Sequence, residues 1–416
     1  MNDDTTTAPT ETVMPGGHPT PATSAPTVTT VPTVTSVPTV TSGPAAPSVA
    51  DASGSNLEAP DDGNECEFAD ESSFVTGPAA LGTGPEACRT LTSSFAAAPL
   101  LGGDYQRAVP LPNGDVLWLL QDVFVSTADG PRLVHNAGVL QHDDRTELLV
   151  TEDSGRPSSY LFADRTIRYR HWYWPLDGAI GADGALHVFV AEMVEHGASY
   201  LSFVEPVATW TVTIEVQDLS VIARGPAPDP SAALYGWSVV SAGDHTYLYA
   251  HCYRQFGWDE LWFAPGVFAH DLDCSAEVTL ARVPRGVFDV EPEYWDGVGW
   301  TDDPARADPV IPMEGRTINP TQVELLDGVF VAVTKVGDWW GNEIVLDTAP
   351  APEGPWTTYD TVAVSVPCDG CDTYFASIVP FGADDETFVV ALSCNVWEGV
   401  DLEHYGPLFL AVPRPN

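Results

Sequence analysis

Five segments of the chain share one pattern of polar and apolar positions: a strand-like stretch, a turn of Gly, Asn or Asp, and an apolar run. The first extends from Asp104 to Ser126. Its turn is Pro112–Gly114, because Asn and Gly tolerate the positive φ that a tight hairpin loop needs. The run Val116–Leu120 that follows is typical of a strand buried on both faces. The pattern therefore predicts a β-hairpin.

The same pattern recurs four more times at spacings of tens of residues. The later segments begin at Trp174, Tyr235, Asn319 and Tyr374, and they turn at Asp183–Gly184, Gly243–Asp244, Asp327–Gly328 and Ala383–Asp385. The spacings leave room for one or two outer strands after each hairpin. We therefore expect an all-β fold, a five-bladed β-propeller in which the first strand of each blade lines a central channel.

Acidic residues stand at both ends of the first hairpin. Asp104 and Asp122 are equally far from residue 113, so antiparallel pairing about that turn brings both to one edge of the sheet. Hydrolysis of a glycosidic bond needs one carboxylic acid to protonate the leaving oxygen and one carboxylate as nucleophile or base. Asp104 and Asp122 are the first catalytic candidates. The alternative is that both carboxylates only stabilise loops, for example if Arg107 neutralises one of them.

Two further acids lie on the second hairpin. Asp177 is expected deeper in the channel, where it would tune the pKa of a neighbouring carboxyl group, although an Asp followed by Gly also shapes bends. Glu192 lies at the end of the buried strand. We count both as candidate catalytic residues.

Aromatic residues gather in the connections before and after the hairpins. Trp172 and Trp174 lie in the segment RYRHWYW, and Trp339 and Trp340 are adjacent in a loop flanked by glycines. Such rings either stack on sugars or pack between blades, and adjacent Trp residues in a loop favour a ligand wall. The candidate substrate-binding residues are Arg107, Trp172, Trp174, Tyr235, Trp237, Asn319, Trp339, Trp340 and Tyr374.

Composition divides the chain into three parts. Residues 1–64 are rich in Thr, Pro and Ser with few charges, so we expect a disordered linker or stalk, or a tail without a role. Residues 65–94 form a short entry segment that we expect a disulfide to tether, and residues 95–416 form the propeller.

The location of the protein follows only indirectly from its sequence. The start MNDDTTTAPT lacks the features of a signal peptide, and the apolar runs are shorter than the ~18 residues that a spanning helix needs. A Thr/Pro-rich stalk followed by cysteines nevertheless favours an extracellular or cell-surface protein. We expect no membrane insertion and a monomer.

The chain is strongly acidic. Its 59 acidic and 16 basic residues give a net charge of −43, and Lys335 is the only lysine. Such a surface repels phosphates, so nucleic acid is excluded as a partner.

Seven cysteines allow several pairings. We expect a disulfide between Cys66 and Cys88, and we place Cys252 and Cys274 on successive strands of the third blade. Cys371 is expected to join Cys394. The alternative for Cys368-Asp-Gly-Cys371 is a redox or zinc half-site, but no second Cys/His pair stands at ligand spacing.

Several segments resemble a known group of propellers. They are Asp104 with Asp122, YGWSVVSAGDHTYLYAH from Tyr235, LARVPRGVFDVEPEYWDGVGW from Leu280, and APEGPWTTYD from Ala351. Together, over residues 95–412, they resemble bacterial five-bladed glycosidase-like propellers. That group includes a domain of unknown function, relatives that cleave D-arabinan and, more distantly, arabinanase and xylosidase propellers. The second aspartate of that group usually follows Gly and precedes Thr-Phe, whereas here it lies in Gln121-Asp122-Val123-Phe124. The resemblance implies a carbohydrate-active protein.

Two classes of function follow from these observations. The first is a glycoside hydrolase that acts on a polysaccharide, of the arabinan type or another furanose-rich envelope polymer. The second is a non-catalytic propeller that binds glycan or protein at the cell surface. No nucleophile elbow, phosphate loop or dinucleotide fingerprint is present, so we expect no cofactor, while structural calcium stays open.

Overall fold

The regular secondary structure of the described residues consists mainly of antiparallel β-sheets. The computed structural model describes residues 81–142, 145–166, 170–196, 203–230, 233–251, 278–311, 321–336, 341–396 and 401–415. All of them belong to the unit Cys66–Asn416, whereas the unit Met1–Glu65 lies outside them. No helix among these residues is long and apolar enough to cross a membrane. The division of the chain into residues 1–64, 65–94 and 95–416 stays a prediction, because most of the first two parts lies outside the described residues.

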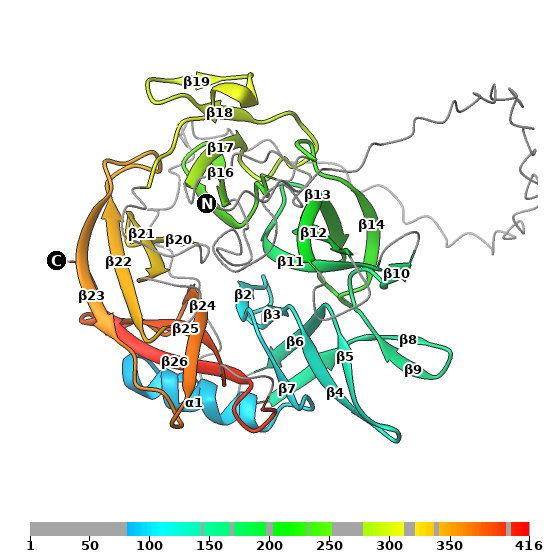
Figure 1. Ribbon diagram of the computed structural model, residues 1–416. Coiled ribbons are helices and arrows are strands. Elements are labelled where there is room, and N and C mark those ends of the chain that lie inside the picture. The colour runs from blue at the N-terminus through cyan, green and yellow to red at the C-terminus, as the bar shows by residue number, and fades with distance from the viewer. Residues whose placement is uncertain are drawn as a thin grey trace, which may run out of the picture. The chain divides into compact units, whose positions relative to one another are not determined.

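Five sheets extend outward from a common centre (Figure 1). The first consists of β2 (Arg107–Pro110), β3 (Val116–Leu120), β6 (Ala137–His142) and β7 (Arg145–Leu149). The second consists of β10 (Arg165–Thr166), β11 (Arg170–Ile180), β12 (Leu186–His196), β13 (Phe203–Ile214) and β14 (Val221–Pro226). The third consists of β15 (Ser238–Ala242), β16 (His245–His251), β17 (Val278–Pro284), β18 (Glu293–Trp295) and β19 (Trp300–Thr301). The fourth consists of β20 (Gln322–Leu326), β21 (Val329–Lys335), β22 (Glu343–Ala349) and β23 (Thr357–Ala363). The fifth consists of β24 (Cys371–Val379), β25 (Thr387–Val396) and β26 (Gly406–Pro413).

The hairpin strand that opens each sheet contacts the corresponding strands of its neighbours. β2 contacts β11, β11 contacts β15, β15 contacts β20, β20 contacts β24, and β24 returns to β2. The sheets therefore close into a ring around these strands, which is the arrangement of a β-propeller. Closure protects the edges of the inner strands, because each has a neighbour on both sides.

The five predicted hairpins are confirmed. They are formed by β2 with β3, β11 with β12, β15 with β16, β20 with β21, and β24 with β25. Gly114, Gly184, Gly243 and Gly328 all have positive φ. The predicted turns were found because these residues accept a conformation that most side chains disfavour.

Smaller elements lie outside the five sheets. β1 (Gly102–Gly103), β4 (Val123–Thr127) and β5 (Gly130–Val134) form a three-stranded sheet, and β8 (Thr151–Asp153) pairs with β9 (Arg156–Ser158). A 3₁₀ helix, η2, covers Pro304–Arg306.

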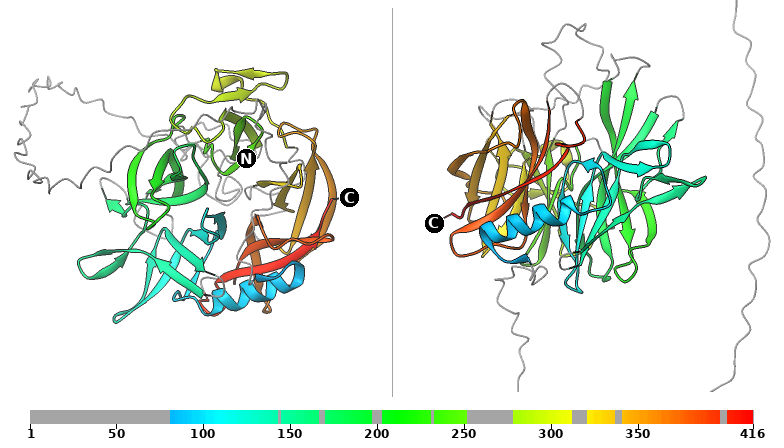
Figure 2. Two further views of the ribbon diagram at one scale, coloured as in Figure 1. Left: turned by 180° about the vertical axis from the view of Figure 1, so that it is seen from behind. Right: turned by 90° about the horizontal axis from the view of Figure 1, so that it is seen from below.

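The sequence analysis missed the helix α1 (Gly84–Ala96) in the entry segment. It packs against β25 and β26, as Figure 2 shows. Leu91 and Phe95 are buried, and the Phe95 ring lies 5.1 Å from the fully buried Trp118 of β3. The helix thus joins the first and fifth sheets through apolar contacts.

Two disulfide predictions are wrong. Cys88 has a free thiol buried beneath α1, so the expected bond with Cys66, a residue outside the described ranges, is not formed. Cys371 is bonded to Cys368, while Cys394 is free and buried. The physical reason is strand register, since Cys394 lies opposite Thr373 rather than opposite Cys371. Cys252 and Cys274 lie outside the described residues.

Candidate active site

Asp104 and Asp122 meet at one edge of the first hairpin, as their spacing predicts. Beyond the pair Arg107–Leu119, the amide of Gln121 donates to the Asp104 carbonyl at 3.0 Å. The Asp104 amide donates to the Asp122 carbonyl at 3.3 Å. The backbone therefore fixes the two aspartates side by side.

Asp104 occupies a buried position at this edge. Its carboxyl Oδ2 accepts a hydrogen bond from the Tyr374 hydroxyl at 3.0 Å, and Oδ1 is buried without a hydrogen-bond partner. Burial and the nearby charge of Asp122 raise the pKa of Asp104 well above its ordinary value, although Tyr405 and Tyr374 act in the opposite direction. Burial beside a second acid therefore favours the protonated form of Asp104.

Asp122 is more accessible and differently bonded. Its side chain is 27% exposed, and Oδ1 accepts a hydrogen bond from Trp174 Nε1 at 2.9 Å. His135 Nδ1 lies 2.6 Å from the same oxygen. The Trp174 indole and the His135 imidazole therefore hold this carboxylate from one side. The two adjacent acids thus have opposite surroundings.

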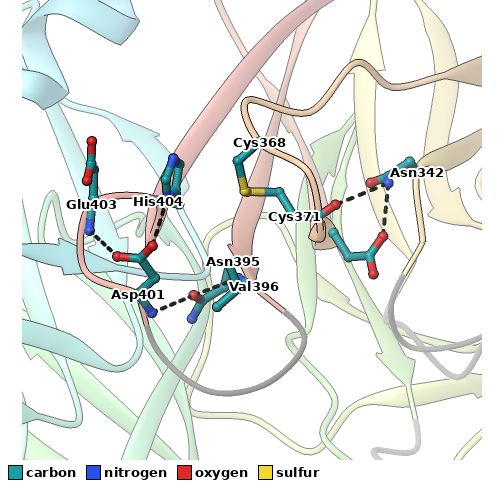
Figure 3. The surroundings of a disulfide bond; sticks show 9 residues. Asn342, Cys368, Cys371, Asn395, Val396, Asp401, Glu403 and His404 are labelled. Carbon is teal, nitrogen blue, oxygen red and sulfur yellow. Dashed lines mark hydrogen bonds and ion pairs between the residues drawn. A yellow bond between two sulfur atoms is a disulfide. The ribbon is translucent and has the colours of Figure 1, made fainter.

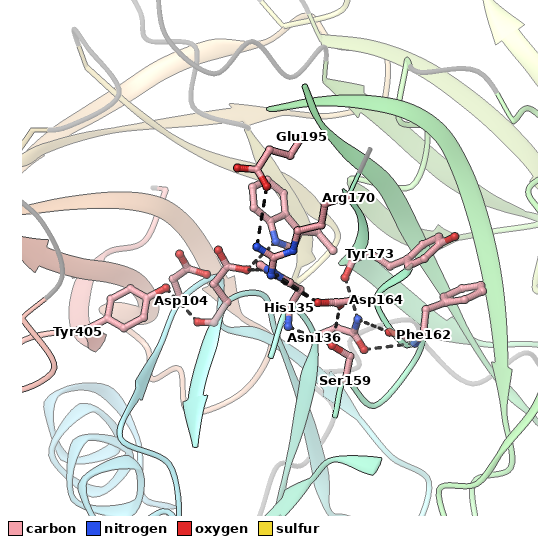
Figure 4. Close-up of polar contacts among 12 residues, drawn as sticks. Asp104, His135, Asn136, Ser159, Phe162, Asp164, Arg170, Tyr173, Glu195 and Tyr405 are labelled. Atoms are coloured by element: carbon pink, nitrogen blue, oxygen red, sulfur yellow. Dashed lines mark hydrogen bonds and ion pairs between the residues drawn. The ribbon is translucent and has the colours of Figure 1, made fainter. Parts of the chain in front are cut away.

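His135 links Asp122 to a group of charges at the second sheet (Figure 4). Its ring stacks on Trp172 with centroids 4.9 Å apart, and its Nε2 contacts Arg170. Arg170 NH2 also lies 3.6 Å from Asp164 Oδ2 and Arg170 NH1 lies 3.9 Å from Glu195 Oε2. This network holds the imidazole in a defined orientation against Asp122.

Asp177 lies deeper, among the innermost strands. A β-bulge between Pro175 and Gly178 interrupts the register of β11 at this residue, and bulges reorient the side chains they carry. Asp177 accepts hydrogen bonds from the amides of Gly178 at 2.8 Å and Val239 at 2.9 Å. Burial raises the pKa of Asp177 to about 6, even though Arg107 lowers it.

Arg107 pairs with this deeper acid rather than with Asp104 or Asp122, which we call the mouth pair because they lie at the outer edge of the first hairpin. Its Nε lies 3.8 Å from Asp177 Oδ1, and among the described residues no arginine forms an ion pair with Asp104 or Asp122. Glu324 of β20 belongs to the same group. Burial and the charge of Asp177 raise the pKa of Glu324 to about 8. Asp177 and Glu324 therefore both act on the buried guanidinium of Arg107.

Glu192 lies in a strongly basic environment. Its Oε1 accepts hydrogen bonds from Arg165 at 2.6 Å and His171 at 2.8 Å, and Oε2 accepts one from Trp210 at 2.8 Å. Burial raises its pKa, but these three donors outweigh burial, and the pKa of Glu192 is lowered. All of these partners are on the second sheet or beside it, so the structure does not join Glu192 to the mouth pair.

The predicted aromatic wall is mostly packed inside the protein. Five of its residues form one buried cluster: Trp172, Trp174, Tyr235, Trp237 and Tyr374. Trp172 and Trp174 contact edge to face at 5.9 Å. Two of these residues contact the acids: the Trp174 indole N–H donates to Asp122, and the Tyr374 hydroxyl donates to Asp104. Asn319, Trp339 and Trp340 lie outside the described residues.

Comparisons with known proteins place the chain in a family. A family model described as "Domain of unknown function (DUF5005)" matches residues 96–407. The chain belongs to the DUF5005 family. A search of curated proteins finds no match.

Solved structures similar to this DUF5005 chain include glycoside hydrolases. A Bacteroides ovatus ATCC 8483 protein that is proposed to be a hydrolase has a TM-score of 0.59 at 16% identity, over 78% of this chain and 88% of that one. The GH43_1 enzyme from Xanthomonas citri complexed with xylose has a TM-score of 0.43 at 14% identity, over 80% and 93%. The catalytic domain of a Coprinopsis cinerea GH62 α-L-arabinofuranosidase has a TM-score of 0.43 at 9% identity, over 74% and 90%. The Bacteroides protein shares the fold of the DUF5005 domain.

Several residues of the candidate site were not among the residues predicted from the sequence. Glu324 interrupts the apolar run of an inner strand, and that interruption was a usable signal. His135 and Tyr405 gave none, because both lie in connections between strands: His135 follows β5, and Tyr405 lies between β25 and β26. The Tyr405 hydroxyl donates to the Asp122 carbonyl at 2.9 Å.

Proposed function

We propose that this protein is a glycoside hydrolase that cleaves a polysaccharide, with Asp104 and Asp122 as its catalytic pair. One observation carries the proposal: two adjacent carboxyl groups have opposite environments, since Asp104 is buried with a raised pKa and Asp122 is accessible and bonded to N–H donors. Paired acids whose surroundings separate their protonation states are the requirement for glycosidic hydrolysis.

The general acid in this proposal is Asp104. Tyr374 donates to Oδ2, and Oδ1 is buried without a hydrogen-bond partner, so substrate binding must open a path from the Oδ1 proton to the leaving oxygen of the sugar. The anion that remains after proton transfer keeps the hydrogen bond from Tyr374. That hydrogen bond stabilises the charge as it develops.

Asp122 is the nucleophile or the general base. Its hydrogen bond from Trp174 and its contact with His135 fix the carboxylate while part of the side chain stays open to solvent. Arg107 and Asp177 form an ion pair below the mouth, so Asp177 acts on the pair only through the local electric field. Glu192 has no part in this mechanism.

The proposal extends to architecture, substrate and location. We take each of the five sheets as one blade of a five-bladed propeller. The segments that resemble arabinan-cleaving propellers make an arabinan-type polysaccharide the first substrate to test. The Thr/Pro-rich N-terminal sequence and the Cys368–Cys371 disulfide support an exported, surface-exposed enzyme. It acts as a monomer without a cofactor.

The test is a hydrolysis assay of the full chain on a polysaccharide panel that includes arabinan and xylan. Asp104→Asn and Asp122→Asn are the test variants. Asp129→Asn is the matched control, because Asp129 is 78% exposed and pairs only with Arg156 on the surface. Release of reducing ends by the wild type and the control, with loss in both test variants, supports the proposal. Retained polysaccharide binding by a wild type that releases nothing would instead establish the non-catalytic alternative.

A further inference from the structure

The Cys368–Cys371 pair has a third neighbour that is distant in sequence. One side-chain ligand atom from each of Cys368, Cys371 and His404 lies within 4.8 Å of the other two (Figure 3). Thiolate and imidazole together are the ligand set that Zn²⁺ prefers, and no acidic side chain is needed to complete it.

Strand pairing produces this proximity. Cys371 begins β24 and His404 precedes β26 by two residues, and both strands pair with β25. The Cys371 amide donates to the Cys368 carbonyl at 3.2 Å, which closes the turn between them. Asn342 holds this turn from the fourth sheet, with its Nδ2 2.9 Å from Asp372 Oδ1.

His404 is oriented by a second independent contact. Its Nδ1 lies 2.9 Å from Asp401 Oδ2, so donation from Nδ1 leaves Nε2 with a free lone pair. Asp401 is itself fixed, because the Glu403 amide donates to its Oδ1 at 3.1 Å and its own amide donates to Asn395 at 3.1 Å. A carboxylate bonded to the far nitrogen of an imidazole is the usual support of a histidine that binds zinc.

We propose that Cys368, Cys371 and His404 form a zinc site that opens when the disulfide is reduced. Two equivalents of a small thiol supply two electrons and two protons, which convert the disulfide to two thiols and yield the thiol's own disulfide. Zn²⁺ then binds both sulfurs as thiolates with His404 and releases the two sulfur protons. Water takes the fourth position.

The site must widen for this to occur. Tetrahedral Zn²⁺ with Zn–S bonds of about 2.3 Å needs its sulfur atoms roughly 3.8 Å apart, farther than a disulfide holds them. Rotation about the Cys368 side chain is sufficient, since Cys368 is only half-buried while Cys371 is fixed in β24. Oxidation and metal binding therefore exclude each other.

The experiment compares oxidised and reduced full chain under anaerobic conditions. Co²⁺ is added first, because thiolate ligation gives a charge-transfer band in the near ultraviolet, and Zn²⁺ then displaces it. We expect one metal ion per reduced chain and none in the oxidised chain. Cys368→Ser and His404→Ala abolish the band, and Asp401→Asn weakens Zn²⁺ binding by about 10- to 100-fold.

Cys394→Ser is the matched control, because Cys394 also has a buried thiol near this end of the fifth sheet but does not belong to the cluster. It retains wild-type metal binding. Circular dichroism checks the fold of every variant, and Cys368→Ser distinguishes this site from the other cysteines that reduction exposes. A reduced wild type without the band, or a His404→Ala chain that binds like the wild type, would overturn the proposal.

Discussion

The side chains of Asp104 and Glu192 have similarly small exposed fractions, yet their pKa values are shifted in opposite directions. Asp104 is 8% exposed and its pKa is raised, whereas Glu192 is 6% exposed and its pKa is lowered. Burial disfavours the charge of both. The difference lies in their partners: a neutral Tyr374 hydroxyl and the anionic Asp122 for the first, and Arg165, His171 and Trp210 for the second.

In the proposed mechanism, this contrast separates the reactive acid, Asp104, from a structural one, Glu192. A carboxylate that accepts charged donors is stable as an anion and has little tendency to give or take a proton. A buried carboxyl group beside another acid keeps its proton and can donate it. Burial raises the pKa of both acids, and the local donors decide whether that effect is reversed, as it is for Glu192.

Removing the mouth acids is the strongest way to test the contrast. Asp104→Asn and Asp122→Asn are expected to lower the rate of hydrolysis by about 10²- to 10⁴-fold, because general acid–base catalysis contributes on this scale. Glu192→Gln is expected to keep most of the activity. The measurement is kcat/KM on the polysaccharide that the wild type cleaves. Equal losses at Asp104 and Glu192 would erase the distinction.

The ion pair of Arg107 with Asp177 is intermediate between these two environments. Arg107 lies 3.8 Å from Asp177, whereas Arg165 lies 2.6 Å from Glu192. Arg107→Met should destabilise the fold by about 3–5 kcal/mol, since it leaves the buried Asp177 without its counterion. Adding Asp177→Asn should restore part of that loss. Denaturant unfolding of the single and double variants measures both effects, and a double variant no better than Arg107→Met would refute this pairing.

Glu192→Gln tests the structural side of the contrast. We expect a loss of about 1–2 kcal/mol at pH 7, because a charge-assisted bond to a partly exposed arginine is replaced by a neutral one. The folded pKa lies below the unfolded value of about 4.3, so this stability is present above that pH. It should disappear as the pH falls through the folded value. An unfolding series from pH 7 to acid that shows a constant difference would contradict this account.

Asp104→Asn should change the free energy of unfolding least, and it should stabilise the protein where Glu192→Gln destabilises it. The folded pKa of Asp104 lies above the unfolded value of about 3.9, so ionisation of the unfolded chain costs the wild type stability as the pH rises above 4. The variant should therefore be more stable at pH 7, by about 1 kcal/mol or roughly 2–4 °C in Tm. Thermal unfolding across this pH range provides the check. A variant less stable than the wild type at pH 7 would argue for an ionised Asp104.

The sequence predicted the inner part of the fold better than the outer part. The hairpins follow from local signals, because turns such as Asp327–Gly328 and buried runs such as Val116–Leu120 are encoded by neighbouring residues. The proximity of Asp104 and Asp122 follows from pairing arithmetic about one turn. Helix α1 was missed because its amphipathic face has only a few apolar residues and depends on packing against β26.

The rest of the site depends on contacts between distant segments. Tyr405 and Glu324 reach Asp122 or Asp177 only after the ring of sheets has closed. His135 instead faces Asp122 next to the pair Val123–Val134 of β4 and β5. The wrong pairing of Cys371 with Cys394 has the same origin, because register between β24 and β25 decides which side chains face each other. The burial of the aromatic residues, such as Trp172 and Trp237, could not be predicted either, because it depends on packing between neighbouring sheets.

The protonation state of Asp104 at pH 7 is the most direct test of the central claim. Infrared difference spectroscopy between the wild type and Asp104→Asn isolates the carbonyl stretch of this one side chain. The account predicts that the variant loses a neutral carboxylic acid band, and that Glu192→Gln loses only carboxylate bands. Loss of carboxylate bands alone in Asp104→Asn would show that Asp104 is ionised and would contradict its assignment as the general acid.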